Sequence, residues 1–226
     1  LVIILAIAFS AVACGKSVEN SEIPIGDTVE ITDMEGNQVE LDGLPERIVS
    51  LLPSNTEIIF SLGAEDKLVG ITTYCDYPEA TKDIEKIGDF ENPNIELIKK
   101  LDPDVVLAGG YAKEDLVTTL EGLRIPVIYT EAYSFDKIYE SIQLIGKLVN
   151  EESKAEKILE DMRDTIDDIK LKIEDKERPR IFYVSWVDPL ITAGKGTFIH
   201  DIIEMVGAQN IAEDNEGWIR FSIEKL

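Results

Sequence analysis

The stretch that decides the fold is residues 151–175, EESKAEKILEDMRDTIDDIKLKIED. It contains no Gly or Pro, and its apolar residues recur every three or four positions. This spacing predicts an amphipathic helix with one apolar stripe and a solvated charged face. At about 1.5 Å per residue, about 25 residues would make a rod about 37 Å long, which Pro179 would end. The stripe consists of Ala155, Ile158, Leu159, Met162, Ile166, Ile169 and Ile173.

Strands alternate with helices before this rod. A hairpin is expected around Gly36 and Asn37, followed by short apolar strands that alternate with helices. The helix after the first of these strands should begin at Ser54, because Glu57 stands at capping-box spacing. This alternation predicts an α/β lobe with a largely parallel sheet. Strands are expected at residues 47–52, 69–71, 104–108 and 126–129, and helices at residues 94–101, 113–123 and 135–149.

A second α/β unit is expected after the rod, with a strand at residues 181–185, a helix at residues 197–206 and a last helix near Ser222. One strand with one or two helices cannot form a sheet, so the second lobe is expected to be incomplete. The predicted fold class is therefore α/β, with two Rossmann-like lobes joined by a long backbone helix. The expected segments are a first lobe at 28–133, a helical segment at 134–178 and a second lobe at 179–226.

The chain begins with thirteen uncharged residues, LVIILAIAFSAVA, followed by Cys14. This run is shorter than the roughly 20 residues that span a bilayer and matches the apolar core of a signal peptide. Small residues followed by cysteine resemble a bacterial lipobox, so Cys14 is expected to carry lipid and residues 14–27 to form a tether. The protein is then expected on the extracytoplasmic face of the bacterial cell membrane. The alternative is a clipped transmembrane anchor with a chance cysteine.

Composition excludes several classes of function. The net charge is −23, from 45 acidic and 22 basic residues, and such a surface repels nucleic acid. The single histidine, His200, excludes a metal site built from imidazoles, and no cofactor is expected. Cys75 is expected to be a small buried apolar residue rather than a disulfide partner.

No enzymatic motif is present in the sequence. It has no Gly-x-Ser-x-Gly elbow, and the Gly-Lys-Gly-Thr run at residues 194–197 lacks the pattern of a phosphate loop. We therefore expect a protein that is not an enzyme, with an extracellular hydrolase as the less favoured alternative.

Several short motifs in a fixed order, behind the lipobox, carry a resemblance to a known family. They resemble turns of the substrate-binding lipoproteins of ABC importers that have a rigid helical backbone, the group that captures cobalamin, ferric siderophores and haem. The motifs are SLLPSNTE at 50–57, YCDYP at 74–78, NIE at 94–96, LDPDVV at 101–106, TAGKG at 192–196 and GAQN at 207–210.

Within that family the sequence is most similar to the cobalamin-binding branch. The resemblance implies ligand contacts at Pro53, Tyr74, Phe90, Trp186 and Trp218. Aromatic faces suit a large, flat, partly apolar ligand, although each of these side chains could instead belong to a core. Some positions depart from the pattern, since Phe90 stands where cobalamin binders tend to carry Trp. A smaller or different ligand therefore remains open, with a ferric siderophore or haem as the alternative.

The resemblance also implies partners. Members of this family dock on a membrane permease, coupled to an ATPase, through one exposed glutamate in each lobe. The matching positions are Glu114 and Glu224, each expected in the first turn of a helix, where dipole compensation is the other explanation. The implied function is capture of cobalamin or a related corrinoid between the lobes by a monomer, and its delivery to the permease. A sensor lipoprotein that binds without transport would not need these glutamates.

Overall fold

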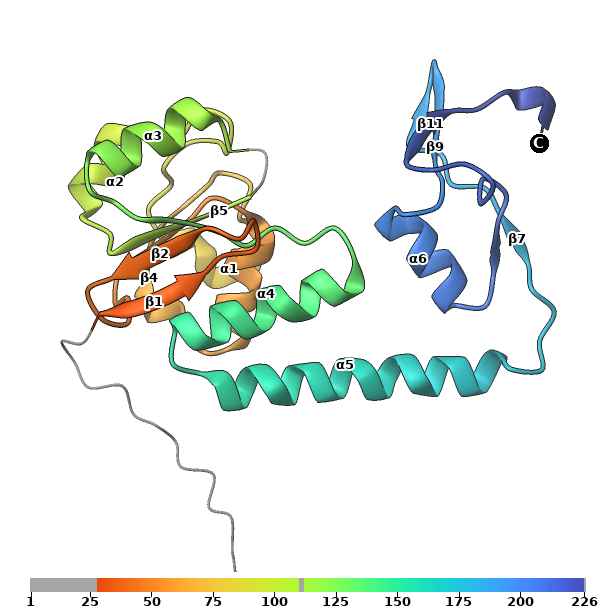
Figure 1. The fold of residues 1–226 in the computed structure, drawn as a ribbon, viewed down its shortest axis with the longest axis horizontal. Coiled ribbons are helices and arrows are strands. Elements are labelled where there is room, and N and C mark those ends of the chain that lie inside the picture. Colours follow the sequence, from red (N-terminus) through yellow and green to blue (C-terminus); the bar gives the residue numbers. More distant parts are fainter. Residues whose placement is uncertain (1–27, 110–111, 226) are drawn as a thin grey trace, which may run out of the picture.

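The computed structural model of the chain describes residues 28–109 and 112–225. Two α/β lobes are joined by one long helix, α5 (Glu152–Ile173), as the rod-like segment in Figure 1 shows. Within the described ranges, no helix is both long and apolar enough to cross a bilayer. The expected signal peptide (1–13), the expected lipidation site at Cys14 and the expected tether (14–27) lie outside these ranges.

The first lobe is built on a four-stranded sheet with strand order β4-β3-β5-β6. All three pairings are parallel, as expected from the alternation of strands and helices. The strands are β3 (Ile48–Ser50), β4 (Leu68–Ile71), β5 (Val105–Ala108) and β6 (Val127–Tyr129). The helices are α1 (Pro53–Ser61), α2 (Ile95–Leu101), α3 (Glu114–Gly122) and α4 (Phe135–Leu148), with short 3-10 turns η1 (Glu65–Lys67) and η2 (Glu79–Asp83).

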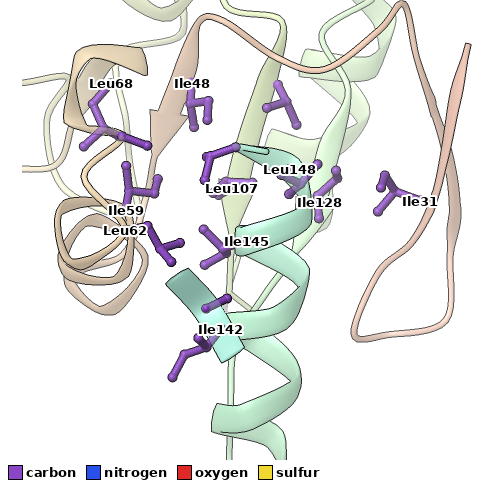
Figure 2. Packing of buried hydrophobic residues seen from close by; sticks show 14 of the residues in the cluster. Ile31, Ile48, Ile59, Leu62, Leu68, Leu107, Ile128, Ile142, Ile145 and Leu148 are labelled. Atoms are coloured by element: carbon purple, nitrogen blue, oxygen red, sulfur yellow. The ribbon is translucent and has the colours of Figure 1, made fainter. Parts of the chain in front are cut away.

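Successive residues of the buried strands face opposite sides of this sheet, because side chains alternate along a strand. In β5, Val105 and Leu107 join the core on the side of α1 and α4, whereas Val106 and Ala108 join the core on the side of α2 and α3. Figure 2 shows the first of these clusters, in which strand residues interdigitate with α1 and α4. The first lobe is therefore a three-layer sandwich. Its strands are continuous apolar runs because both faces of the sheet are buried.

The expected hairpin is present as β1 (Val29–Thr32) paired with β2 (Gln38–Leu41) in antiparallel fashion. Its buried Ile31 extends the first core cluster. At its turn, the Asp33 carboxylate accepts hydrogen bonds from the backbone N–H groups of Glu35 and Asn37 at 3.0 and 2.8 Å. Burial raises the pKa of the nearby Tyr129 hydroxyl, and the negative charge of Asp33 adds to this effect.

The predicted long helix is confirmed as α5. Its first turns pack closely against α4 of the first lobe. A Cβ atom built on Gly146 would lie 2.6 Å from the Cβ of Ala155, so only glycine allows the two helices to approach this closely. Ala155 and Leu159 in the first turns of α5 are buried. The stripe further along α5 is only half-buried, because the rod extends beyond the first lobe.

The second lobe contains more strands than the sequence analysis predicted. The single expected strand at 181–185 is wrong, since β7 covers only Arg180–Ile181 and pairs in parallel with the two-residue strand β10 (Gln209–Asn210). The chain then turns into an antiparallel three-stranded sheet of order β11-β9-β8. Its members are β8 (Trp186–Val187), β9 (Leu190–Ala193) and β11 (Trp218–Arg220), with α6 (Phe198–Met205) following β9.

Two predicted helix starts differ from the structure. Helix α1 begins at Pro53 with Leu52 as the N-cap residue, and no side chain caps it, so the capping box at Ser54 is wrong. Proline at the first helical position has no N–H to leave unsatisfied, which explains a start without a capping side chain. The helix expected near Ser222 is a single 3-10 turn, η3 (Ile223–Lys225).

The two lobes also touch away from α5. The rings of Phe135, at the start of α4, and Phe198, at the start of α6, lie 5.0 Å apart between centroids. Gly207 packs closely against Ile173 at the far end of α5. A Cβ atom built on Gly207 would lie 2.6 Å from the Ile173 side chain. The second lobe is thus held at the end of α5 and at the start of α4.

Leu159→Ala should lower the free energy of unfolding by about 2–5 kcal/mol, because it empties a fully buried site between α5 and the first lobe. Denaturant unfolding followed by circular dichroism measures the change. Leu171→Ala is the matched control on the same helix, because its side chain is 72% exposed and its loss should cost less than about 0.5 kcal/mol. Equal costs for both variants would contradict this packing.

Candidate functional site

The carboxyl edge of the first sheet contains a topological switch point. Strand β3 leads into α1 on one face of the sheet, whereas its neighbour β5 leads into α3 on the opposite face. Loops that diverge in this way leave a crevice where ligands of open α/β sheets bind. Pro53 lies there as the first residue of α1, and Gly109 directly follows β5.

Tyr74 and Phe90 come together beside this edge. Their ring centroids are 5.7 Å apart with the planes tilted by 54°, although the residues stand on different loops. Tyr74 is 57% exposed, so it is a surface aromatic and not a core residue. Both positions were predicted from the sequence as ligand contacts, and the structure places them as one aromatic pair.

The loop that carries Tyr74 is fixed by hydrogen bonds of the next residue, Cys75. The Cys75 sulfur lies 3.3 Å from the Thr56 hydroxyl of α1 and 3.2 Å from the Thr72 hydroxyl. Lys86 donates from Nζ to the Cys75 carbonyl at 2.7 Å. Cys75 is therefore a buried structural residue, as expected, and it fixes its neighbour Tyr74 at the surface.

The two tryptophans lie on strands of the second lobe. Trp218 begins β11 and pairs with Ala193 of β9. Trp186 lies in β8, where its indole N–H donates to the Asp188 carbonyl at 2.9 Å. With exposed fractions of 56% for Trp218 and 61% for Trp186, neither ring is buried in a core.

A second aromatic pair forms around Trp218. The Tyr183 ring lies 6.2 Å from the Trp218 ring in an edge-to-face arrangement, which sequence reasoning missed. The residues predicted as ligand contacts therefore fall into two groups, one on each lobe. Tyr74, Phe90 and Pro53 belong to the first lobe, and Trp186 and Trp218 to the second.

Asn210 fixes the strand against which Trp218 pairs. Its Nδ2 donates to the Ala193 carbonyl at 2.8 Å, and its Oδ1 accepts from the Ala212 N–H at 3.0 Å. Since these two bonds set the orientation of the amide, the 3.3 Å contact between Nδ2 and His200 Nδ1 makes the histidine nitrogen an acceptor. His200 is thus a half-buried structural residue of α6.

Glu131 is a residue of the site that the sequence analysis did not select. It lies two residues after the end of β6 (Val127–Tyr129). The rule that polar residues after parallel strands line the crevice would have found it. Its carboxylate lies over the end of β5. A Cβ atom built on Gly109, the residue after β5, would be only 2.8 Å from Glu131 Oε2. It lines a hollow of about 430 Å³ between α1 and α4, together with Leu52, Ser54 and Glu57.

Asn55 lies below this hollow. It is fully buried, and its Oδ1 accepts from the Thr130 hydroxyl at 2.9 Å. Its Nδ2 has no partner among the described residues. The amide therefore orients a threonine that lines the hollow, rather than the helix start.

The two glutamates predicted to dock on a permease are both exposed. Glu114 is the first residue of α3, directly after Lys113, which donates to Asn92 Oδ1 at 2.9 Å. Glu224 lies in η3, where its N–H approaches the Ser222 hydroxyl at 3.4 Å. One such carboxylate therefore lies on each lobe.

The site residues offer surfaces that can bind a ligand. Across residues 28–109 and 112–225, no three His, Cys, Asp or Glu side chains are grouped so that they could hold a metal ion. Exposed aromatic rings, backbone groups and carboxylates can hold an organic ligand by stacking and hydrogen bonding.

Comparison with known proteins identifies the family of the chain. The profile of the family described as periplasmic binding protein matches residues 48–226, which include the parallel sheet of the first lobe, the rod and the second lobe. The chain belongs to the periplasmic binding protein family. The resemblance inferred from the short motifs is thereby confirmed, as is the predicted α/β fold.

Three similar proteins illustrate this membership. An uncharacterized ABC transporter substrate-binding lipoprotein of Bacillus subtilis strain 168 is 36% identical over 88% of this chain and 65% of its own length. A vitamin B12-binding protein of Salmonella paratyphi A is 30% identical over 80% of this chain and 68% of its own. The crystal structure of a possible iron-binding periplasmic protein of Staphylococcus epidermidis has a TM-score of 0.74 at 33% identity, covering 81% of this chain and 73% of that one. The chain thus spans about two thirds of the length of these curated relatives.

Asn210→Ala should destabilise the second lobe by about 1–3 kcal/mol, because it leaves the buried Ala193 carbonyl and Ala212 N–H without their partner. Tryptophan fluorescence during denaturation reports the loss, since both tryptophans lie in this lobe. Asn215→Ala is the control, because its exposed side chain makes one long 3.4 Å bond. A transition unchanged by Asn210→Ala would show that the amide does not hold β9.

Proposed function

We propose that the protein is the extracytoplasmic binding component of an ABC importer, and that its ligand is cobalamin or a related corrinoid. The observation that carries this proposal is a set of aromatic residues on both lobes, the exposed Tyr74 with the half-buried Phe90 on one and the exposed Trp186 and Trp218 on the other. Exposed rings on two facing bodies suit a ligand that is large, flat and partly apolar. The ligand would be contacted by both lobes.

The relatives support this assignment. The 36% identical protein of Bacillus subtilis is named as an ABC transporter substrate-binding lipoprotein, and the Salmonella protein is named for vitamin B12 binding. The chain carries the motif residues at Pro53 and Tyr74 at the edge where a ligand would enter. Attachment to the membrane would be through lipid on Cys14.

The alternative ligand is a ferric chelate, either a siderophore complex or haem. The name of the Staphylococcus epidermidis protein, a possible iron-binding protein, favours it. Phe90 in place of Trp also leaves room for a different ligand shape. The fold and the role in transport would be the same.

The permease and its ATPase would be the partners. Glu114 and Glu224 stand exposed on separate lobes, as a two-point contact with a cationic permease surface requires. Charge pairs of this kind give orientation and a fast approach more than affinity.

Isothermal titration calorimetry with cyanocobalamin, haem and a ferric siderophore tests the ligand. Cobalamin binding should be saturable, and Trp218→Ala should weaken it more than about tenfold, because an aromatic face at the second-lobe contact is lost. Trp218→Phe is the control that keeps an aromatic ring, and circular dichroism verifies that each variant folds. Unchanged affinity of Trp218→Ala would remove this residue from the ligand site, and binding of the ferric ligand alone would select the alternative.

Glu114→Ala combined with Glu224→Ala should abolish cobalamin uptake by cells and leave the affinity of the purified protein unchanged. Uptake of labelled cobalamin and calorimetry measure the two effects. Glu96→Ala combined with Glu156→Ala is the matched control, because it removes two other exposed helical carboxylates. A loss of affinity in the first variant would place Glu114 or Glu224 at the ligand and not at the permease.

A further inference from the structure

We propose that Lys86 is a positioning residue for ligand binding. Its ammonium group holds the loop after β4 so that the Tyr74 ring stays against Phe90, where a ligand can stack on it. This inference rests on the proposed function, because it concerns two of the aromatic residues expected to contact the ligand.

Tyr74 and Phe90 belong to two segments of the chain that run side by side. The first segment continues from the end of β4, and the second pairs with it in parallel. Backbone hydrogen bonds of 2.8–3.0 Å join residues 71–73 of the first segment to residues 85–88 of the second. Tyr74 lies just beyond the last of these bonds, so further contacts have to fix its position.

The Phe90 side of the pair has an anchor of its own. The Asp89 carboxylate accepts hydrogen bonds from the backbone N–H groups of Glu91 and Asn92 at 2.9 and 2.7 Å. A turn held in this way by an aspartate fixes the backbone around Phe90.

Lys86 supplies the contact on the Tyr74 side. Its backbone pairs with Ile71 at the end of β4, and its Nζ donates to the Cys75 carbonyl at 2.7 Å. Cys75 directly follows Tyr74, and two buried hydroxyl groups already hold its sulfur. One lysine thus links the segment that leads to Phe90 with the residue next to Tyr74.

A charged donor makes this link stronger than a hydrogen bond between neutral groups. The Lys86 side chain is half-buried, so water competes less for the contact than it would at an open surface. An exposed ring that is already held in place loses less conformational entropy when a ligand stacks on it. Lys86 should therefore raise the affinity for the ligand without touching it.

Lys86→Met tests the proposal, because methionine keeps an unbranched apolar side chain and removes the donor. Calorimetry with cyanocobalamin should show binding weaker by about tenfold, as expected for the loss of one hydrogen bond from a charged group. Lys86→Arg keeps a charged donor and should restore most of the affinity. Lys82→Met is the matched control that should leave the affinity unchanged, because it removes the same charge from an exposed lysine paired with Glu79.

A double-mutant cycle separates positioning from direct contact with the ligand. If Lys86 acts through the Tyr74 ring, Lys86→Met should cost little further affinity when Tyr74→Ala is already present. Additive losses would overturn the proposal, because Lys86 would then act independently of that ring.

Hydrogen exchange of the ligand-free protein, measured by mass spectrometry, tests the same link without any ligand. The amides of residues 73–76 should exchange faster in Lys86→Met than in the wild type, while those of α5 keep their protection. Equal exchange at residues 73–76 would show that Lys86 does not hold the loop. Faster exchange in α5 as well would show a general loss of stability, and the positioning role would be wrong.

The outcomes separate this inference from the proposed function. If the wild-type protein binds cobalamin and Lys86→Met binds it equally well, the role of Lys86 is wrong and the proposed function stands. An equal loss in Lys82→Met would also overturn the role, because net charge alone would then be responsible. If haem or a ferric siderophore binds instead, the same weakening is expected for that ligand. If the wild-type protein binds none of them, the proposed function fails and this inference with it.

Discussion

The close contact between Gly146 of α4 and Ala155 of α5 is the constraint on which the two-lobe arrangement depends. It directs the rod out of the first lobe, and the buried side chain of Leu159 secures that direction. The second lobe is then held at the other end by the contact of Gly207 with Ile173, and near α4 by Phe135 and Phe198. The relative position of the aromatic groups on the two lobes follows from these few contacts.

The chemistry of the first lobe is concentrated at one edge of its sheet because all four strands are parallel. Their carboxyl ends point the same way, so Leu52, Gly109 and Glu131 meet although they are distant in sequence. The second lobe reaches a similar result by another route. There an antiparallel sheet presents Trp186 and Trp218 from its two outer strands.

The parts that could be predicted from the sequence depend on local patterns. The continuous apolar runs of β5 and the regular stripe from Ala155 to Ile173 identify their elements, because burial on two faces or on one stripe leaves a distinct periodicity. The strands of the second lobe were missed because β8 is two residues long and exposed, and short exposed strands carry no such periodicity. The position of Glu131 just after a strand could have marked it as a residue of the crevice. Its contact with the end of β5 could not be predicted, because it arises from the order of strands in space, which no local pattern contains.

The rod also has a mechanical consequence. Helix α5 has 22 residues, about 33 Å at about 1.5 Å each, and only its first turns are buried in the first lobe. It is therefore a lever whose pivot is the contact between Gly146 and Ala155. A tilt of about 6° at that pivot would carry the far end of such a rod about 3 Å, so one methyl group added at position 146 would displace the tryptophans of the second lobe far more than the pivot itself.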